Sequence, residues 1–135
     1  CIDTWLGGIE HWEMLHEYRK YGSPVGLYEQ FMANVLYYDY EKTIYPLQQT
    51  SLIAAKLLLK NEITSKLIYI DGSHEETDVY LDLCAYWPLV EDGGILFGDD
   101  YSDVGGVRLA VDRFIAENNT KLTIINGTPI FYLKK

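Results

Sequence analysis

Two short apolar runs that each end in aspartate constrain the fold of this chain most strongly. Lys66 to Ile70 reads as a strand and stops at Asp71, and Ile95 to Gly98 reads as a second strand and stops at Asp99. Between them lies a helical pattern with an apolar stripe. A strand, a helix and a second strand over about 30 residues form a βαβ unit, whose strands are parallel and adjacent or nearly so. The sequence therefore predicts an α/β fold.

The rest of the chain continues this alternation of strands and helices. Helices are predicted over residues 10–21, 27–38, 52–60, 75–87 and 107–117, and a turn is predicted at the sequence EDGG, residues 91–94. Strands are predicted at the start of the chain and over residues 43–47, 122–125 and 130–133, the last two joined by the turn NGTP. Such a pattern implies a largely parallel sheet covered on both faces, with the terminal hairpin as an antiparallel edge.

The length of the chain limits the number of domains, and its net charge limits the kinds of partner it can bind. The chain has 135 residues, which we expect to form one domain over residues 1–135, and its 48% apolar content argues against disorder. A net charge of −9 repels phosphate backbones, so we do not expect the protein to bind nucleic acid.

The longest apolar run is far too short to span a membrane, and the chain does not open with a secretory leader. Cys1 and Cys84 lack metal-ligand spacing and are expected to be reduced thiols in a cytoplasmic protein.

Acidic residues follow two neighbouring predicted strands, which points to a cation site. Asp71 follows one strand, and Asp99 with Asp100 follows the other. Carboxyl ends of parallel strands gather ligands at one edge of a sheet, and adjacent strands lie about 4.8 Å apart. Three converging carboxylates could supply the oxygen ligands that Mg²⁺ or another hard divalent cation needs. The alternative is that Asp100 caps the following segment while Asp99 faces water.

The sequence DGSHEE, residues 71–76, adds two polar side chains to the same loop. Ser73, with Glu76 three residues later, has the spacing of a capping box at the start of a helix. His74 is a candidate general base, because the ordinary pKa of histidine is about 6.5. Alternatively, His74 only orients Asp71 or lies on the surface.

Near the start of the chain, two residues could contact a nucleotide. Asp3 ends the first predicted strand, where an acidic side chain can accept the hydroxyls of a ribose. Trp5 could stack on an adenine or fill a core gap. The alternative for Asp3 is a loop aspartate without a partner. The three Gly-Gly pairs do not make a phosphate-binding loop, since none has the spacing G-x-G-x-x-G before a helix.

A long stretch of this sequence resembles a known family. LIYIDGSHEETDVYLDLCAYWPLVEDGGILFGDDY resembles the latter half of class I S-adenosylmethionine-dependent methyltransferases. It is most similar to a bacterial group related to catechol-type O-methyltransferases and cephalosporin-hydroxylase-like proteins. CIDTWLGG resembles the second-strand motif of this group, and GVRLAVDRFIAE resembles the helix after the fifth strand. The resemblance extends from Cys1 to Leu133.

The resemblance implies a Rossmann-like methyltransferase sheet that begins at its second strand and ends in a reversed hairpin strand. The first βα unit, with the glycine-rich loop for the methionine part of the cofactor, would precede Cys1. The chain then corresponds to a truncated methyltransferase-like domain, which we expect to bind cofactor weakly or not at all. Without the first strand, the second and fourth strands of the family's sheet lose a neighbour, so we expect direct closure of the gap or pairing with a second copy as a homodimer.

The resemblance also implies roles for individual residues. Asp71, Asp99 and Asp100 would bind Mg²⁺ or another hard divalent cation, although relatives commonly carry Asn at the position of Asp100. The lysine that serves relatives as the base has no clear counterpart, so His74 is only a positional substitute. The cofactor S-adenosylmethionine would have its ribose at Asp3, and it would also contact Trp5, Gln49, Thr50, Ser51, Asp71 and Ser73.

The function implied is metal-assisted O-methyl transfer to a small-molecule acceptor. Two alternatives stay open. One is a nucleotide-binding α/β protein of another class, such as a dehydrogenase fragment, although the reversed terminal hairpin argues against it. The other is a catalytically silent module that mediates assembly.

Overall fold

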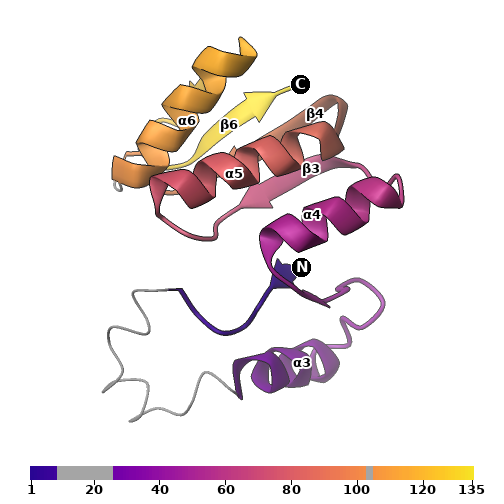
Figure 1. The fold of residues 1–135 in the computed structure, drawn as a ribbon. Helices are drawn as coiled ribbons and strands as arrows, with labels where there is room; N and C mark the ends of the chain where they lie inside the picture. Colours follow the sequence, from indigo (N-terminus) through magenta and orange to yellow (C-terminus); the bar gives the residue numbers. More distant parts are fainter. Residues whose placement is uncertain (9–25, 103–104) are drawn as a thin grey trace. The chain divides into compact units, whose positions relative to one another are not determined.

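The computed structural model describes residues 1–8, 26–102 and 105–135 (Figure 1). These residues form two compact units, residues 1–54 and residues 55–135. The helix predicted over residues 10–21 lies outside the described residues. Among the helices that are described, none combines the length and the apolar character needed to cross a membrane.

The first unit contains a small parallel sheet and one helix. Strand β1 (Ile2–Asp3) pairs in parallel with β2 (Leu47–Gln48), and Asp3 lies opposite Gln48. Helix α3 (Leu27–Tyr37) lies where the apolar spacing predicted it. The strand predicted over residues 43–47 is wrong except at its last residue. The N–H groups of Thr43 and Ile44 both donate to the carbonyl of Tyr40 at 2.9 Å, so this segment turns instead of pairing.

Helix α4 (Ser51–Lys60) begins one residue before the helix predicted over residues 52–60. The carbonyl of Thr50 accepts the N–H of Ala54 at 3.0 Å, which places Thr50 directly at the helix start. The division between the two units falls within this helix.

The second unit contains a four-stranded sheet with the order β3-β4-β6-β5. Its strands are β3 (Ser65–Ile70), β4 (Val90–Gly98), β5 (Leu122–Ile124) and β6 (Phe131–Lys134). β3 and β4 are parallel, whereas β6 is antiparallel to both β4 and β5. This arrangement confirms the α/β class, the βαβ unit and the reversed terminal hairpin.

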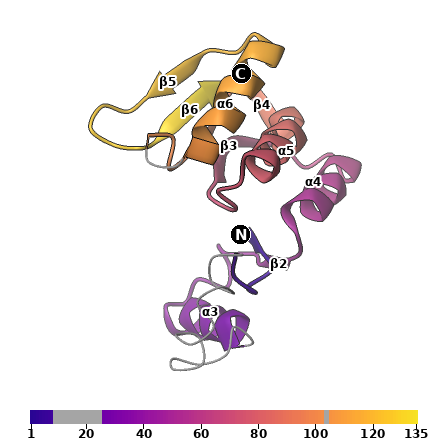
Figure 2. The same ribbon diagram turned by 60° about the vertical axis from the view of Figure 1, so that its left-hand side comes forward.

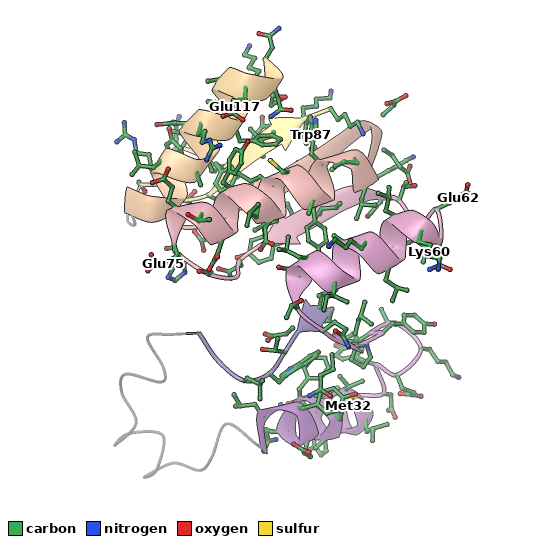
Figure 3. All side chains as sticks on the ribbon, viewed as in Figure 1. Met32, Lys60, Glu62, Glu75, Trp87 and Glu117 are labelled. Carbon is green, nitrogen blue, oxygen red and sulfur yellow. The ribbon has the colours of Figure 1, made fainter. Side chains whose placement is uncertain are left out.

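Two helices cover one face of this sheet, side by side (Figures 1 and 2). They are α5 (Glu76–Tyr86), which continues into the 3-10 turn η2 (Trp87–Leu89), and α6 (Gly105–Asn118). The predicted apolar stripes of both helices are buried, whereas Glu117 lies on the outer surface of α6 (Figure 3). The core of the unit consists of side chains from both helices, the 3-10 turn and the sheet, namely Val79, Leu83, Tyr86, Leu89, Leu96, Val107, Ala110, Val111, Phe114, Phe131 and Leu133.

The sequence EDGG does not form the separate turn that was predicted, because β4 continues through it. The register jumps from Ser65 opposite Val90 to Leu67 opposite Ile95, so these residues bulge out of the strand pair. Gly93 has a φ of +75°, which glycine adopts without strain. Its N–H donates to the carbonyl of Lys135 at 3.0 Å, so the end of the chain stabilises the bulge.

Strand β3 forms one edge of the four-stranded sheet. Its Leu67 and Tyr69 side chains are 59% and 50% exposed. One expectation from the sequence was direct closure of the gap, in which the family's second and fourth strands, β1 and β3 here, pair with each other. Among the described residues, β1 pairs with β2 and β3 pairs with β4, so this pairing is not observed. Pairing of this edge with a second copy stays a prediction.

Candidate functional site

The carboxyl ends of β3 and β4 bring the predicted acidic residues to one edge of the sheet. Ile70 lies opposite Gly98 in the parallel register, so Asp71 and Asp99 leave neighbouring strands at the same level. This adjacency confirms what the spacing of the two apolar runs predicted. A small hollow opens at this edge, lined by Ile70, Asp71, Gly72, Ser73, His74, Val79, Asp99, Asp100, Val107 and Phe131.

Within this hollow, the ligand atoms of Asp71, His74 and Asp100 lie within 4.8 Å of one another. His74 Nε2 and Asp100 Oδ2 are 3.0 Å apart. The side chains of His74 and Asp100 are 43% and 27% exposed, so they are open to an ion or a small ligand from solvent. Among the described residues, this group offers one imidazole nitrogen and two carboxylates from two strand ends, a set that could hold a cation.

Asp99, the third predicted metal ligand, occupies a different position from Asp100. Its Oδ1 accepts the backbone N–H of Asp100 at 2.9 Å. Asp100 has a φ of +63°, a left-handed conformation that aspartate tolerates better than most residues. Asp99 therefore stabilises the turn that directs the carboxylate of Asp100 toward His74. A metal-binding role for Asp99 itself stays a prediction.

Two glycines allow the strand end and the loop to approach their neighbours, and the sequence analysis missed both. A Cβ atom at Gly98 would lie 2.7 Å from the ring of Phe131 and 2.8 Å from the carbonyl oxygen of Ile70. A Cβ atom at Gly106, at the start of α6, would overlap the carbonyl oxygen of His74. The available signal was their position in the sequence. Gly98 lies immediately before the acidic pair, and Gly106 lies six residues after it, without any phosphate-loop spacing.

The electrostatic potential of the hollow is negative. The hydroxyl of Tyr69 donates to Asp71 Oδ2 at 2.9 Å. Burial, this hydrogen bond, and the charges of Asp71, Asp99 and Asp100 raise the pKa of Tyr69 from 10.0 to about 12. Among the described residues that line the hollow, none is lysine or arginine. A divalent cation would offset this concentration of negative charge.

Ser73 does not form the predicted capping box. Its hydroxyl accepts the N–H of Glu75 at 3.1 Å, while Glu75, whose backbone is extended, is the residue that precedes α5. The helix begins at Glu76, so Ser73 lies two residues before the capping position and cannot reach the third helical N–H. The hydrogen bond shapes the loop that carries His74 instead.

In the first unit, Asp3 and the predicted cofactor loop lie together. The N–H of Gln49 donates to the carbonyl of Asp3 at 3.1 Å, which places the loop of Gln49, Thr50 and Ser51 beside the end of β1. Asp3 Oδ1 accepts the N–H of Trp5 at 2.7 Å. The contact of these residues with a cofactor stays a prediction.

Trp5 occupies the core of the first unit. It is only 9% exposed, and its ring lies 5.0 Å from that of Tyr28 and 4.9 Å from that of Phe31, measured between centroids. Little of the ring is open to an adenine, which favours the core alternative from the sequence analysis. Stacking on the cofactor stays a prediction.

Comparison with known families shows where this site belongs. Residues 1–101 match the methyltransferase domain family, and this range includes both the loop of the first unit and the carboxylates of the second. The chain belongs to this methyltransferase family. The recognition of a class I methyltransferase from the sequence is therefore confirmed. No curated protein matches the chain at a significant level.

The methyltransferase fold is also found in solved structures that this chain resembles. The apo structure of CalS11, a TDP-rhamnose 3'-O-methyltransferase of calicheamicin biosynthesis, is 18% identical, with a TM-score of 0.63 over 98% of this chain and 56% of the other. The O-methyltransferase from Bacillus cereus in complex with SAH is 16% identical, with a TM-score of 0.56 over 76% of this chain and 56% of the other. This methyltransferase chain thus spans a little over half the length of these structures.

Two tyrosines make the stability of the protein depend on pH in the alkaline range. The pKa values of Tyr69 and Tyr86 are raised from 10.0 to about 12, primarily by burial. Because the folded pKa exceeds the unfolded one, this contribution to stability is complete below pH 10 and is lost as the pH rises toward 12. We expect the free energy of unfolding in urea to fall over this interval.

An ultraviolet absorbance titration of the wild type and of Tyr69→Phe would assign one of these phenols. The difference between the two curves should have its midpoint near pH 12. A midpoint near pH 10 would contradict the hydrogen bond to Asp71 and the influence of the neighbouring carboxylates on the half-exposed Tyr69.

Proposed function

We propose that this protein is an S-adenosylmethionine-dependent O-methyltransferase that acts on a small molecule with the help of a divalent cation. Membership of the methyltransferase family supports the reaction class. The likeness to O-methyltransferase structures, one of them in complex with SAH, supports the fold and favours this cofactor. The observation that carries the proposal is the convergence of carboxylates at the ends of the parallel strands β3 and β4.

The first unit supplies the cofactor contacts in this proposal. Asp3 accepts the ribose hydroxyls of S-adenosylmethionine with its exposed carboxylate, since only Oδ1 is engaged by Trp5. The loop of Gln49, Thr50 and Ser51 borders the adenine. In the second unit, Asp71 and Ser73, which follow β3, are proposed as further cofactor contacts.

The second unit supplies the metal-binding groups. Asp71 and Asp100 bind the cation, and Asp99 either joins them or positions Asp100. When bound by these carboxylates, a divalent cation would supply Lewis-acid chemistry, favouring the deprotonated form of an acceptor hydroxyl. The hydroxyl of Tyr69 donates to Asp71 Oδ2 and so holds this carboxylate in place for the cation. Methyl transfer would require the acceptor oxygen to be held close to the methyl group of the cofactor, which would leave as S-adenosylhomocysteine.

The cofactor assignment is tested by titration calorimetry with S-adenosylhomocysteine and, separately, with NAD. We expect binding of S-adenosylhomocysteine only, weakened about 10-fold to 100-fold in Asp3→Asn, because hydrogen bonds to a charged carboxylate are lost. Asparagine keeps the Oδ1 atom that accepts the N–H of Trp5, so the turn is preserved. Glu41→Gln, which removes an exposed carboxylate of the same unit, serves as the control.

Binding of NAD in place of S-adenosylhomocysteine would overturn the proposed cofactor and favour the dehydrogenase alternative. Equal affinities of the wild type and Asp3→Asn for S-adenosylhomocysteine would leave the reaction class standing and remove Asp3 from the site.

A further inference from the structure

We propose that Asp82 of α5 is a positioning residue, whose buried carboxylate fixes the loop of residues 71–74 and thereby the direction of the site residues in that loop. The inference rests on the proposed function, because Asp71 and Ser73 are among its proposed cofactor contacts. Asp82 does not line the hollow at the ends of β3 and β4, so it acts through the loop.

The burial of Asp82 is unusual for its charge. Its residue is 8% exposed, and no other charged residue is buried in the part of the chain that the structure describes. It lies on the inner face of α5, together with Val79 and Leu83. Burying a carboxylate is costly unless donors within the protein replace the lost water. No buried side-chain oxygen or nitrogen of the described residues lacks a hydrogen-bond partner, so the cost of burial is met by groups of the protein itself.

The carboxylate of Asp82 lies beside the loop that follows β3. A Cβ atom placed on Gly72 would be 3.7 Å from Asp82 Oδ2, which is van der Waals contact. Gly72 stands between Asp71 and Ser73 in the sequence. Movement of the main chain at Gly72 therefore redirects the side chains on both sides of it.

A neighbouring tyrosine shows the electrostatic effect of Asp82 on this face of α5. Tyr86 follows Asp82 by four residues, about one helical turn, and is also buried. Burial and then the charge of Asp82 raise the pKa of Tyr86 from 10.0 to about 12. A carboxylate in such surroundings attracts N–H groups more strongly than a neutral acceptor of the same size does.

The other end of the loop is held by α6, so Asp82 supplies the support from α5 (Figure 1). The carbonyl of His74 packs against Gly106 at the start of α6, and the hydroxyl of Ser73 accepts the N–H of Glu75. Loss of the Asp82 carboxylate should therefore release the loop mainly at Gly72 and Ser73. Side chains that bind a ligand are effective only when their own supports hold them in place.

The motion of the loop is measured by ¹⁵N relaxation of the full chain. In the wild type, we expect order parameters of about 0.85 for the N–H groups of Gly72 and Ser73, as in rigid backbone. In Asp82→Asn, which keeps the size of the side chain and removes its charge, these should fall below about 0.6 while those of β4 stay unchanged. Asp82→Ser, whose hydroxyl is too short to reach Gly72, should give the same result and serves as the second variant if Asp82→Asn does not fold.

Asp78→Asn is the matched control. Asp78 lies one turn before Asp82 on the same helix, and its side chain is exposed. The substitution removes the same charge, so it should leave the order parameters of the loop unchanged.

Titration calorimetry with S-adenosylhomocysteine links the loop to the proposed function. We expect the affinity to fall about tenfold in Asp82→Asn, because the contacts of Asp71 and Ser73 are no longer held in place, and to be unchanged in Asp78→Asn. Failure of the wild type to bind S-adenosylhomocysteine would overturn the proposed cofactor, while the relaxation data would still decide whether Asp82 fixes the loop.

Two results would overturn the role of Asp82. One is a folded variant whose order parameters at Gly72 and Ser73 equal those of the wild type. The other is an equal fall of the order parameters in β4, which would show that Asp82 supports the fold as a whole and not the loop. A mobile loop with unchanged affinity for S-adenosylhomocysteine would overturn the link between Asp82 and the cofactor.

Discussion

Replacement of Gly106 by alanine is expected to weaken divalent-cation binding about tenfold or more and to destabilise the protein by about 1 to 3 kcal/mol. The added Cβ atom would overlap the carbonyl oxygen of His74, which is backbone and cannot rotate away. The loop that carries Asp71 and His74 must therefore move. Titration with MnCl₂ and urea unfolding followed by circular dichroism measure the two effects.

The adjacent residue offers a matched control for this substitution. A Cβ atom at Gly105 meets nothing within 4 Å, although both glycines lie at the start of α6. Gly105→Ala should therefore leave metal binding and stability nearly unchanged. Equal losses of stability and metal binding in the two variants would contradict the contact of Gly106 with the loop as the cause, since alanine has a higher helix propensity than glycine.

The second large effect is expected at Phe114. Its ring is 1% exposed, lies between α6 and the sheet and meets the ring of Trp87 edge-on at 5.8 Å. Phe114→Ala removes this buried ring and should lower the free energy of unfolding by about 3 to 5 kcal/mol. For a small unit this is a large share of the total stability, so the variant is expected to be partly unfolded at room temperature.

Leu109 on the same helix is the control for Phe114. Its side chain is 56% exposed, so Leu109→Ala should change the unfolding midpoint in urea only slightly. A small effect of Phe114→Ala, similar to that of Leu109→Ala, would contradict the packing of α6 against the sheet.

The features that could be predicted from the sequence are those with local and periodic signals. The strands around Ile70 and Gly98 were predicted because each is a short apolar run that stops at aspartate, and their parallel pairing follows from the helix between them. The buried face of α6 was predicted because Val107, Val111 and Phe114 recur at helical spacing.

The features that were missed depend on residues far apart in the sequence. The bulge at Gly93 is stabilised by the backbone of Lys135, which no local pattern reveals. The orientation of His74 toward Asp100 depends on the contact of its loop with Gly106 and on the left-handed turn at Asp100. Sequence spacing placed the acidic residues at one edge of the sheet, but it could not show which side chains converge there.

The measurement that tests the account most directly is an anomalous difference map from crystals grown with MnCl₂ and S-adenosylhomocysteine. The account predicts a manganese peak beside the carboxylates of Asp71 and Asp100, at the carboxyl ends of β3 and β4. A map without a peak at these residues, or with the ion bound elsewhere on the protein, would contradict it.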